Sequence, residues 1–197
     1  MLIKEVKKLQ NSPISKVISN RIKEFKSYPK EGLFLELSFC LMTANFNAER
    51  AIKIQNSIQD GFLTFSENKL SKTLKYLGHR FPNARAKYIV EARKHDLHII
   101  NLIKDKRDFL VKNVKGLGFK EASHFLRNIG YSDYAIIDFH IIDLLVKNKM
   151  ISKPKILNKT KYLEIEKVLS KLAAKLNLKL DELDLYLWYL ETGKVLK

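Results

Sequence analysis

The chain carries the stretch VKGLGFKEASHFLRNIG at residues 114–130, in which a turn with two glycines separates the end of one helix from the start of the next. In the second half, apolar residues recur at spacings of three and four, the period of a helix with one buried face. They are Phe119, Ala122, Leu126 and Ile129. The stretch therefore predicts two helices joined by a short hairpin.

The hairpin glycines, Gly116 and Gly118, allow two interpretations. Glycine adopts backbone angles closed to other residues, and its missing side chain lets a ligand approach the chain closely. The first N–H groups of the second helix are unpaired and lie at the positive end of its dipole, an arrangement that binds a phosphate. In the alternative interpretation the glycines only form the turn between two helices.

Helical periodicity extends over most of the chain, which has only four prolines and seven glycines to interrupt it. Alternating patterns typical of strands are nearly absent, so the sequence predicts an all-α protein. A polar connection is expected at residues 152–160. The expected helices cover residues 1–9, 14–25, 33–44, 48–59, 67–77, 84–93, 106–113, 119–129, 137–147, 161–176 and 180–190.

The composition narrows the class of protein. Among 197 residues, 37 Lys and Arg oppose 21 Asp and Glu, giving a formal charge of +16, and 46% of the residues are hydrophobic. That mixture builds a core and attracts an acidic partner, although such a charge also suits an anionic membrane or simply solubility. No apolar run reaches the ~18 residues of a membrane span, and the N-terminus lacks the apolar region of a secretory signal. We therefore expect an intracellular protein.

Several kinds of site are excluded or weakly indicated. A single cysteine, Cys40, cannot form an internal disulfide or a four-cysteine iron–sulfur cluster. There is no phosphate-binding loop of the ATPase type. His95 and His98 are spaced for a shared metal ion, but no carboxylate-rich cluster lies near them in the sequence, so we interpret them as surface residues.

An acidic residue, Asp138, lies downstream of the hairpin in the apolar run AIIDFHII at residues 135–142. A lone acid in such a context is usually the N-cap of a helix, here one starting near Phe139. Taken with the hairpin and with Lys120 just inside its second helix, however, this aspartate resembles the arrangement in helix–hairpin–helix DNA glycosylases with associated lyase activity.

The resemblance covers nearly the whole chain. Within this superfamily, the chain is most similar to the archaeal type 2 8-oxoguanine DNA glycosylase/AP lyases. It rests on FCLMTANF at 39–46, GHRF at 78–81, RAKYIV at 85–90, KEASHFLRNIG at 120–130 and LDLYLWY at 183–189. The chain departs from this branch at Phe139, where an arginine is usual, so a phosphate or structural contact made by that arginine is missing.

The resemblance implies an all-α, two-domain glycosylase fold with the lesion pocket in the interdomain cleft. Residues 32–131 are expected to form one helical domain that ends in the hairpin, and residues 1–31 with 132–197 the other.

The implied activity is that of a bifunctional enzyme of base excision repair, which excises 8-oxoguanine and nicks the strand by β-elimination. The implied partner is double-stranded DNA with 8-oxoguanine or abasic sites, bound by a cytoplasmic monomer. No cofactor is implied, and a metal ion on the carbonyls of residues 115–118 stays open.

The chemistry calls for a nucleophile and a carboxylate. A neutral lysine amine can attack C1′ of the damaged nucleotide and form a Schiff base with the opened sugar, which allows elimination of the 3′-phosphate. By the resemblance Lys120 is this nucleophile, and Asp138 orients it and stabilises positive charge on the sugar. The competing interpretation of Lys120 is one more solvated lysine.

The remaining expected site residues come from the resemblance. Phe81 and Trp188 match aromatic residues that sandwich the extruded base, and either is otherwise ordinary core. Asn45 matches an asparagine that fills the space left by the flipped nucleotide, and is otherwise a loop cap. Lys115, with the two hairpin glycines, is expected to contact the DNA.

Lys197 matches a terminal lysine in the damaged-base pocket. Guanine N7 accepts a hydrogen bond, whereas 8-oxoguanine carries a proton at that nitrogen. A carboxylate only accepts, so the α-carboxylate of Lys197 would bind the lesion and repel guanine.

Two other functions compete with this one. The same lysine chemistry could act on another oxidised base, although the absent cysteine cluster argues against the iron–sulfur relatives that prefer pyrimidines. Alternatively, the chain is a non-catalytic hairpin module that binds DNA structure.

Overall fold

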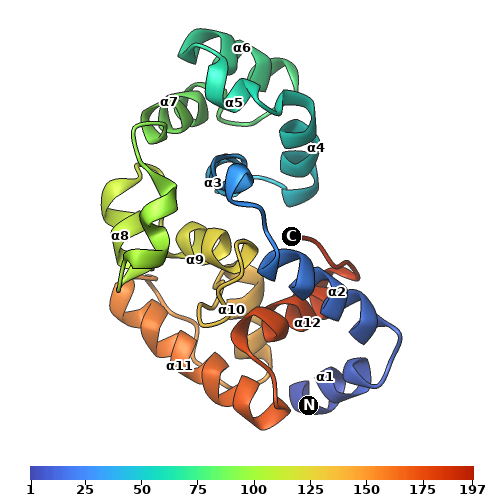
Figure 1. Cartoon of the computed structure of the whole chain (residues 1–197). Coiled ribbons are helices and arrows are strands. Elements are labelled where there is room, and N and C mark those ends of the chain that lie inside the picture. The colour runs from blue at the N-terminus through green and yellow to red at the C-terminus, as the bar shows by residue number, and fades with distance from the viewer. The chain divides into compact units, whose positions relative to one another are not determined.

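The computed structural model describes residues 1–197 and contains only helices and the loops between them (Figure 1). The predicted all-α class is confirmed. Two short 3-10 helices are η1 (Lys30–Gly32) and η2 (Leu97–Leu102). The α-helices are α1 (Leu2–Gln10), α2 (Ile14–Lys26), α3 (Leu33–Thr43), α4 (Ala48–Ile58), α5 (Gly61–Thr64), α6 (Glu67–Tyr76), α7 (Pro82–Ala92), α8 (Lys106–Asn113), α9 (Phe119–Asn128), α10 (Phe139–Lys147), α11 (Lys159–Leu176) and α12 (Leu180–Thr192).

The observed helices differ from the expected ones mainly at their ends. Helix α7 begins two residues earlier than expected, at Pro82, because proline suits the first helical position. Helix α10 begins at Phe139, because Asp138 before it has an extended backbone and caps the helix. The elements missed by the sequence, η1, α5 and η2, are too short to show a clear helical period.

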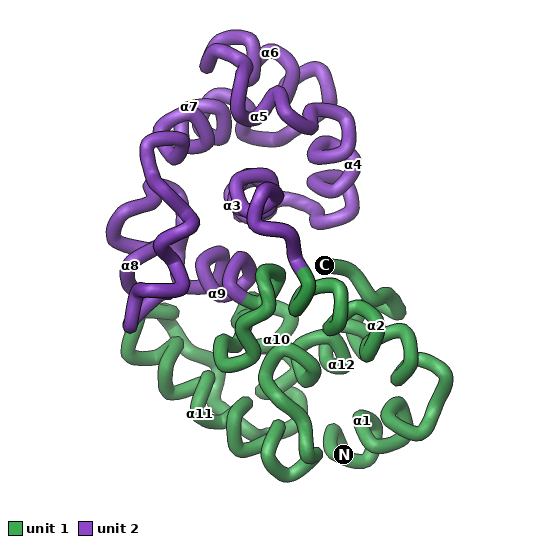
Figure 2. Tube along the Cα trace, in the orientation of Figure 1, with its two compact units in different colours: residues 1–27, 127–197 green, residues 28–126 purple.

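The chain divides into two compact units (Figure 2). Unit 1 consists of Met1–Ser27 and Arg127–Lys197, and unit 2 of Tyr28–Leu126.

Unit 2 is built around α3, whose sequence LFLELSFCLMT is apolar on almost every side. This helix packs against α4, α5, α7 and η2, and α6 packs along α7. Cys40 is fully buried, as expected of a small core residue. Glu36 is also fully buried, and the Tyr28 hydroxyl donates a hydrogen bond of 3.1 Å to its carboxylate.

Unit 1 is built around α12, which packs against α1, α2, α10 and α11. Its buried side chains include Leu183, Leu185, Tyr186 and Leu187, which lie on more than one face of the helix. That distribution explains why its sequence reads as apolar rather than as clearly amphipathic. The expected polar connection lies between α10 and α11, where no helix forms.

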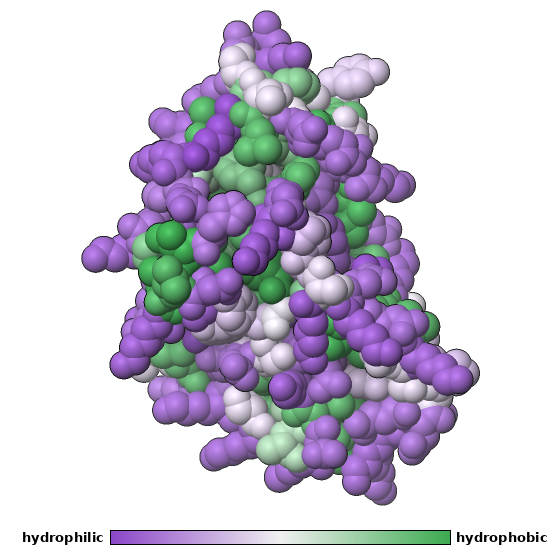
Figure 3. Space-filling model, in the orientation of Figure 1, coloured by the Kyte–Doolittle hydropathy of each residue, from purple (hydrophilic) through white to green (hydrophobic).

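The surface matches the composition. On the face shown in Figure 3, hydrophilic residues predominate and hydrophobic ones gather in small groups. No helix is both long enough and apolar enough to cross a membrane.

Candidate active site

The predicted hairpin forms between α8 and α9 in unit 2. Arg107 of α8 donates a 3.2 Å hydrogen bond to the Ser123 hydroxyl of α9, and its guanidinium lies 5.1 Å from the centre of the Phe119 ring. Val114 and Leu117 are buried at the turn. These contacts hold the first turn of α9 in a fixed place relative to α8.

The two hairpin glycines are needed for different reasons. Gly116 has φ +91°, and a Cβ there would lie 2.4 Å from the Tyr88 ring, so both the backbone angle and the close ring demand glycine. Gly118 is not in the left-handed region, and a Cβ there would meet only the end of the Glu121 side chain, at 3.0 Å. At Gly116 the space left by the missing side chain is therefore occupied by Tyr88 rather than open to a ligand.

Lys120 is the second residue of α9, and its side chain is 22% exposed. Its Nζ lies 3.9 Å from Oε1 of Glu121, while Oε2 of Glu121 accepts a 3.2 Å hydrogen bond from the Gly118 N–H. Glu121 thus reaches back over the start of its own helix, as an acid at the third helical position commonly does. The sequence interpretation assigned no role to this glutamate, although its position in the first turn was visible.

Asn45 lies in the loop after α3, exposed and with φ +56°, a conformation that asparagine tolerates better than most residues. The carbonyls around it are held by other elements of unit 2. Arg85 of α7 donates a 2.7 Å hydrogen bond to the Ala44 carbonyl, and a ring nitrogen of His79 lies 3.1 Å from the Met42 carbonyl. Hydrogen bonds therefore hold the backbone just before and just after Thr43, the last residue of α3.

Phe81 is exposed at the start of α7 and lies close to two arginines, with its ring centre 5.0 Å from the guanidinium of Arg80 and 5.9 Å from that of Arg85. The Arg85 guanidinium is also 5.9 Å from the Tyr88 ring, which packs on Gly116. Burial lowers the pKa of Arg85, and the Glu121 carboxylate partly offsets this. Arg85 is thus a shared neighbour of the Asn45 loop, Phe81 and the hairpin.

In unit 1, Asp138 caps α10. Its Oδ1 accepts a 3.0 Å hydrogen bond from the Ile141 N–H, so the capping role considered from the sequence is real. This bond uses one carboxylate oxygen and leaves the other for a further partner.

The segment before Asp138 is fixed by hydrogen bonds to α11. The Tyr162 hydroxyl accepts a hydrogen bond from the Ile137 N–H at 3.1 Å and donates one to the Ala135 carbonyl at 2.7 Å. The Ala135 N–H donates to Glu166 at 2.9 Å. A buried residue thus binds the backbone on each side of Ile136, directly before the aspartate.

Upstream, the same segment is held by α2 and α12. Gly130 has φ +99°, and a Cβ there would lie 3.0 Å from the Phe25 carbonyl, which makes this glycine a close approach to α2. The Ser132 hydroxyl donates a 2.9 Å hydrogen bond to Asp181, whose pKa burial raises. Arg127 and Asp184 form an ion pair of 3.5 Å.

Trp188 lies on α12, and His140 of α10 contacts it edge to face with ring centres 5.4 Å apart. The His140 ring in turn lies 3.9 Å from the ring of Phe139, which is 66% exposed. The indole N–H of Trp188 is buried without a hydrogen-bond partner. Lys197 follows α12 and is partly exposed.

The structure divides the expected site residues between the two units. Unit 2 holds Asn45, Phe81, Lys115, Gly116, Gly118 and Lys120, and unit 1 holds Asp138, Trp188 and Lys197. Several residues that contact these site residues or their segments were assigned no role from the sequence. They are His79, Arg85, Tyr88 and Glu121 in unit 2 and His140, Tyr162 and Glu166 in unit 1.

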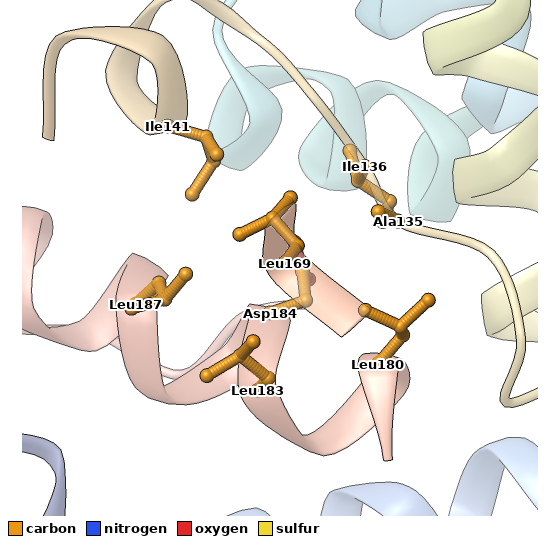
Figure 4. A pocket seen from close by; sticks show the side chains of 8 residues that line it. All are labelled: Ala135, Ile136, Ile141, Leu169, Leu180, Leu183, Asp184 and Leu187. Atoms are coloured by element: carbon orange, nitrogen blue, oxygen red, sulfur yellow. The ribbon is translucent and has the colours of Figure 1, made fainter. Parts of the chain in front are cut away.

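Two other features were considered as sites. A small pocket beside Asp184 is lined by apolar side chains of residues 135–136, α10, α11 and α12 (Figure 4). Its volume of about 10 Å³ holds a single water molecule and no nucleobase. No group of three or more His, Cys, Asp or Glu side chains is arranged to hold a metal ion.

A helical hairpin between α8 and α9, with Lys120 inside its second helix and Asp138 at the start of a later helix, is the arrangement on which the resemblance to helix–hairpin–helix DNA glycosylases rests. A family model described as 8-oxoguanine DNA glycosylase matches residues 18–178. The chain therefore belongs to the 8-oxoguanine DNA glycosylase family.

Individual relatives match over their full length. The 8-oxoguanine DNA glycosylase/AP lyase of Methanocaldococcus jannaschii is 53% identical over 100% of both chains, and that of Korarchaeum cryptofilum is 50% identical over 100% of this chain and 98% of its own. The crystal structure of the M. jannaschii enzyme with a 15mer DNA containing 8-oxoguanine has a TM-score of 0.97, at 52% identity and 100% coverage of both chains. The structure of the Thermotoga maritima 8-oxoguanine DNA glycosylase has a TM-score of 0.93, at 41% identity, covering 100% of this chain and 98% of that one.

Proposed function

We propose that this protein is a bifunctional 8-oxoguanine DNA glycosylase/AP lyase of base excision repair. The observation that carries the proposal is the full-length match to a structure solved with 8-oxoguanine DNA, at a TM-score of 0.97 and 52% identity. The proposed substrate is double-stranded DNA with 8-oxoguanine or an abasic site, and the protein acts on it as a cytoplasmic monomer associated with DNA. The proposed domains are the two compact units, of which the one with the hairpin covers Tyr28–Leu126 where residues 32–131 were expected.

Lys120 is the proposed nucleophile. Its amine forms a bond to C1′ while the C1′–N bond to the base breaks, and the displaced base takes up a proton. The lysine nitrogen then loses a proton and the C1′–O4′ bond of the sugar opens to give a Schiff base, in which loss of a C2′ proton eliminates the 3′-phosphate. Asp138 carries a carboxylate that favours the positive charge developing on the sugar. The fixed start of α9 supports the first role, and the rigid segment before α10 supports the second.

Base recognition is proposed for Phe81, Trp188 and Lys197. Stacking of a base on an aromatic ring contributes about 1–3 kcal/mol. The buried indole N–H of Trp188 offers a donor to an incoming ligand. The Lys197 α-carboxylate would accept a hydrogen bond from the N7–H group of 8-oxoguanine, so deleting Lys197 should slow 8-oxoguanine excision far more than cleavage at an abasic site, which needs no base recognition.

Binding to the remaining DNA is proposed for Asn45, Lys115, Gly116 and Gly118. Asn45 is exposed on an anchored loop, which suits a residue that fills the space of a flipped nucleotide. At the hairpin, the Gly118 N–H donates to Glu121, so a phosphate would bind the other N–H groups at the start of α9. Because Tyr88 fills the space at Gly116, the exposed Lys115 and Gly118 are the closer candidates for direct contact.

Borohydride trapping tests the function in one assay. The wild type should form a covalent adduct on a duplex with 8-oxoguanine, and Lys120→Gln should bind that duplex but form none. Lys112→Gln removes an exposed lysine of the neighbouring helix and serves as the matched control, with trapping unchanged.

The same assay separates the competing functions. Trapping on a duplex with an oxidised pyrimidine but not on 8-oxoguanine would change the substrate. Binding without any trapping would indicate a non-catalytic DNA-binding module.

A further inference from the structure

His79 lies in the turn between α6 and α7, and its two ring nitrogens link the last turn of α3, at Met42, to Phe81 at the start of α7. The side chain is 4% exposed. Its Nε2 lies 3.1 Å from the Met42 carbonyl, and its Nδ1 accepts a 3.0 Å hydrogen bond from the Phe81 N–H. The last turn of α3 leads into the loop that contains Asn45, and Phe81 directly precedes α7.

The two partners fix the protonation state of the ring. A backbone N–H only donates, so Nδ1 must keep its lone pair, and a carbonyl only accepts, so Nε2 must carry the hydrogen. His79 is therefore neutral in this arrangement. A second proton would place an N–H at Nδ1 against the N–H of Phe81 and break that link.

The surroundings of the ring disfavour a positive charge. Burial lowers the pKa of His79, the hydrogen bond to Met42 acts in the opposite direction, and Arg85 and Arg50 lower the pKa further. Arg50 of α4 donates a 3.3 Å hydrogen bond to the Gly78 carbonyl, next to His79. No carboxylate contributes to the His79 shift.

The ring also packs between the loops. Phe46 stacks on it with ring centres 4.1 Å apart and planes inclined by 30°. Phe46 directly follows Asn45, so the stacking fixes the far side of the loop that follows α3. Both hydrogen bonds and the stacking act on the same few residues.

We propose that neutral His79 is a positioning residue that holds the Asn45 loop and Phe81 in place for DNA, and that protonation of its Nδ1 releases Phe81. The inference rests on the DNA-contacting roles proposed above for Asn45 and Phe81. It assigns a role in this protein to a histidine that itself contacts neither the base nor the reacting atoms.

Two variants separate the links. In His79→Asn, the shorter amide can still accept from the Phe81 N–H, whereas in His79→Gln the longer one can still donate to the Met42 carbonyl. Neither amide titrates. His98→Asn is the matched control, because His98 is exposed on η2.

The measurement is the single-turnover rate of 8-oxoguanine excision between about pH 5 and pH 8, expressed as the ratio of the wild-type rate to the variant rate. Effects of pH on the chemical step are common to both proteins and cancel in this ratio. We expect a ratio of about ten at the alkaline end, as misplacement of contact residues commonly produces, falling toward one as His79 is protonated. The control ratio should be one throughout. A ratio that does not change with pH, or no difference in rate, overturns the proposal.

Nuclear magnetic resonance of the full chain provides a test that needs no folded variant. Long-range proton–nitrogen correlation spectra should show Nδ1 without a hydrogen and Nε2 with one at pH 6.5, the ordinary pKa of histidine. The other tautomer, or a charged ring at that pH, overturns the proposal whatever the activity. If the wild type excises no 8-oxoguanine, the proposed function fails instead, and the spectra still decide the state of His79.

Discussion

Asp138 combines a capping role with a proposed catalytic one, and its two carboxylate oxygens allow the roles to be separated. Oδ1 is engaged by the Ile141 N–H. Asparagine keeps an oxygen for that bond but removes the negative charge, whereas alanine removes both. The residue is thus suited to a paired substitution.

We predict that Asp138→Asn lowers the excision rate by about 10²–10³-fold, the usual effect of removing one electrostatic group from a reaction centre, while its melting temperature stays near that of the wild type. Asp138→Ala should also lose about 1 kcal/mol of stability as a lost cap. Single-turnover kinetics and thermal unfolding measure the two effects. Full activity in the Asn variant would reduce Asp138 to a helix cap.

Among the elements, α11 holds the segment before α10 partly through one buried hydroxyl, which forms two of its hydrogen bonds. Tyr162 is 2% exposed, and its oxygen serves both the Ile137 N–H and the Ala135 carbonyl. The hydroxyl therefore provides hydrogen-bond partners for two backbone groups of the loop between α9 and α10.

We predict that Tyr162→Phe lowers the free energy of unfolding by about 1–3 kcal/mol, because two buried backbone groups lose their partner. Excision should slow as well, since the position of Asp138 depends on this segment. Tyr76→Phe is the control, because the Tyr76 side chain is 89% exposed and losing its hydroxyl should change neither quantity. Denaturant unfolding and excision rates check both. A variant as stable as the wild type would show that the hydroxyl contributes nothing.

For the molecule as a whole, the net charge of +16 favours binding to DNA, which is a polyanion. Because phosphate neutralisation releases counterions, the affinity for DNA should fall steeply as the salt concentration rises. Each phosphate contact contributes a slope of about −0.9 in the log–log plot. Phe139 stands where the resembling enzymes usually carry an arginine, and it is exposed.

We predict that Phe139→Arg steepens the slope by about 0.9, the value for one added phosphate contact, whereas Phe139→Leu leaves it unchanged. Binding of the same duplex at several salt concentrations measures it. An unaltered slope in the arginine variant would mean that position 139 reaches no phosphate.

The dependence of stability on pH should contain two opposing contributions. The pKa of His79 is lowered by burial from 6.5, so the unfolded chain binds more protons and stability is lost as the pH falls below about 6.5. The pKa of Asp181 is raised by burial from 3.8, so its contribution is present below about pH 3.8 and is lost as the pH rises through the folded value.

Unfolding free energies across pH test this pair. His79→Gln should flatten the loss below about pH 6.5, and Asp181→Asn should flatten the opposite trend above about pH 3.8. Curves parallel to that of the wild type would contradict the assigned burial effects.

The helical class, most helix positions and the hairpin with Lys120 are predictable from the sequence, because they depend on local periodicity and on residues adjacent in the chain. The sequence also indicated that Asp138 begins a helix, since a cap and its partner lie three residues apart. The family followed from long matching segments such as KEASHFLRNIG, which need no coordinates.

The contacts that hold these residues in place are visible only in the folded protein. Tyr88 fills the space at Gly116 from 28 positions away, and Tyr162 binds the backbone at Ile137 from 25 positions away. The motif GHRF was recognised in the sequence, but the contacts of its His79 with Met42 and the Phe81 N–H appear only in the structure. Such contacts bring together side chains that are distant in the chain, and a single sequence records neither their distances nor the burial that fixes the charge on His79.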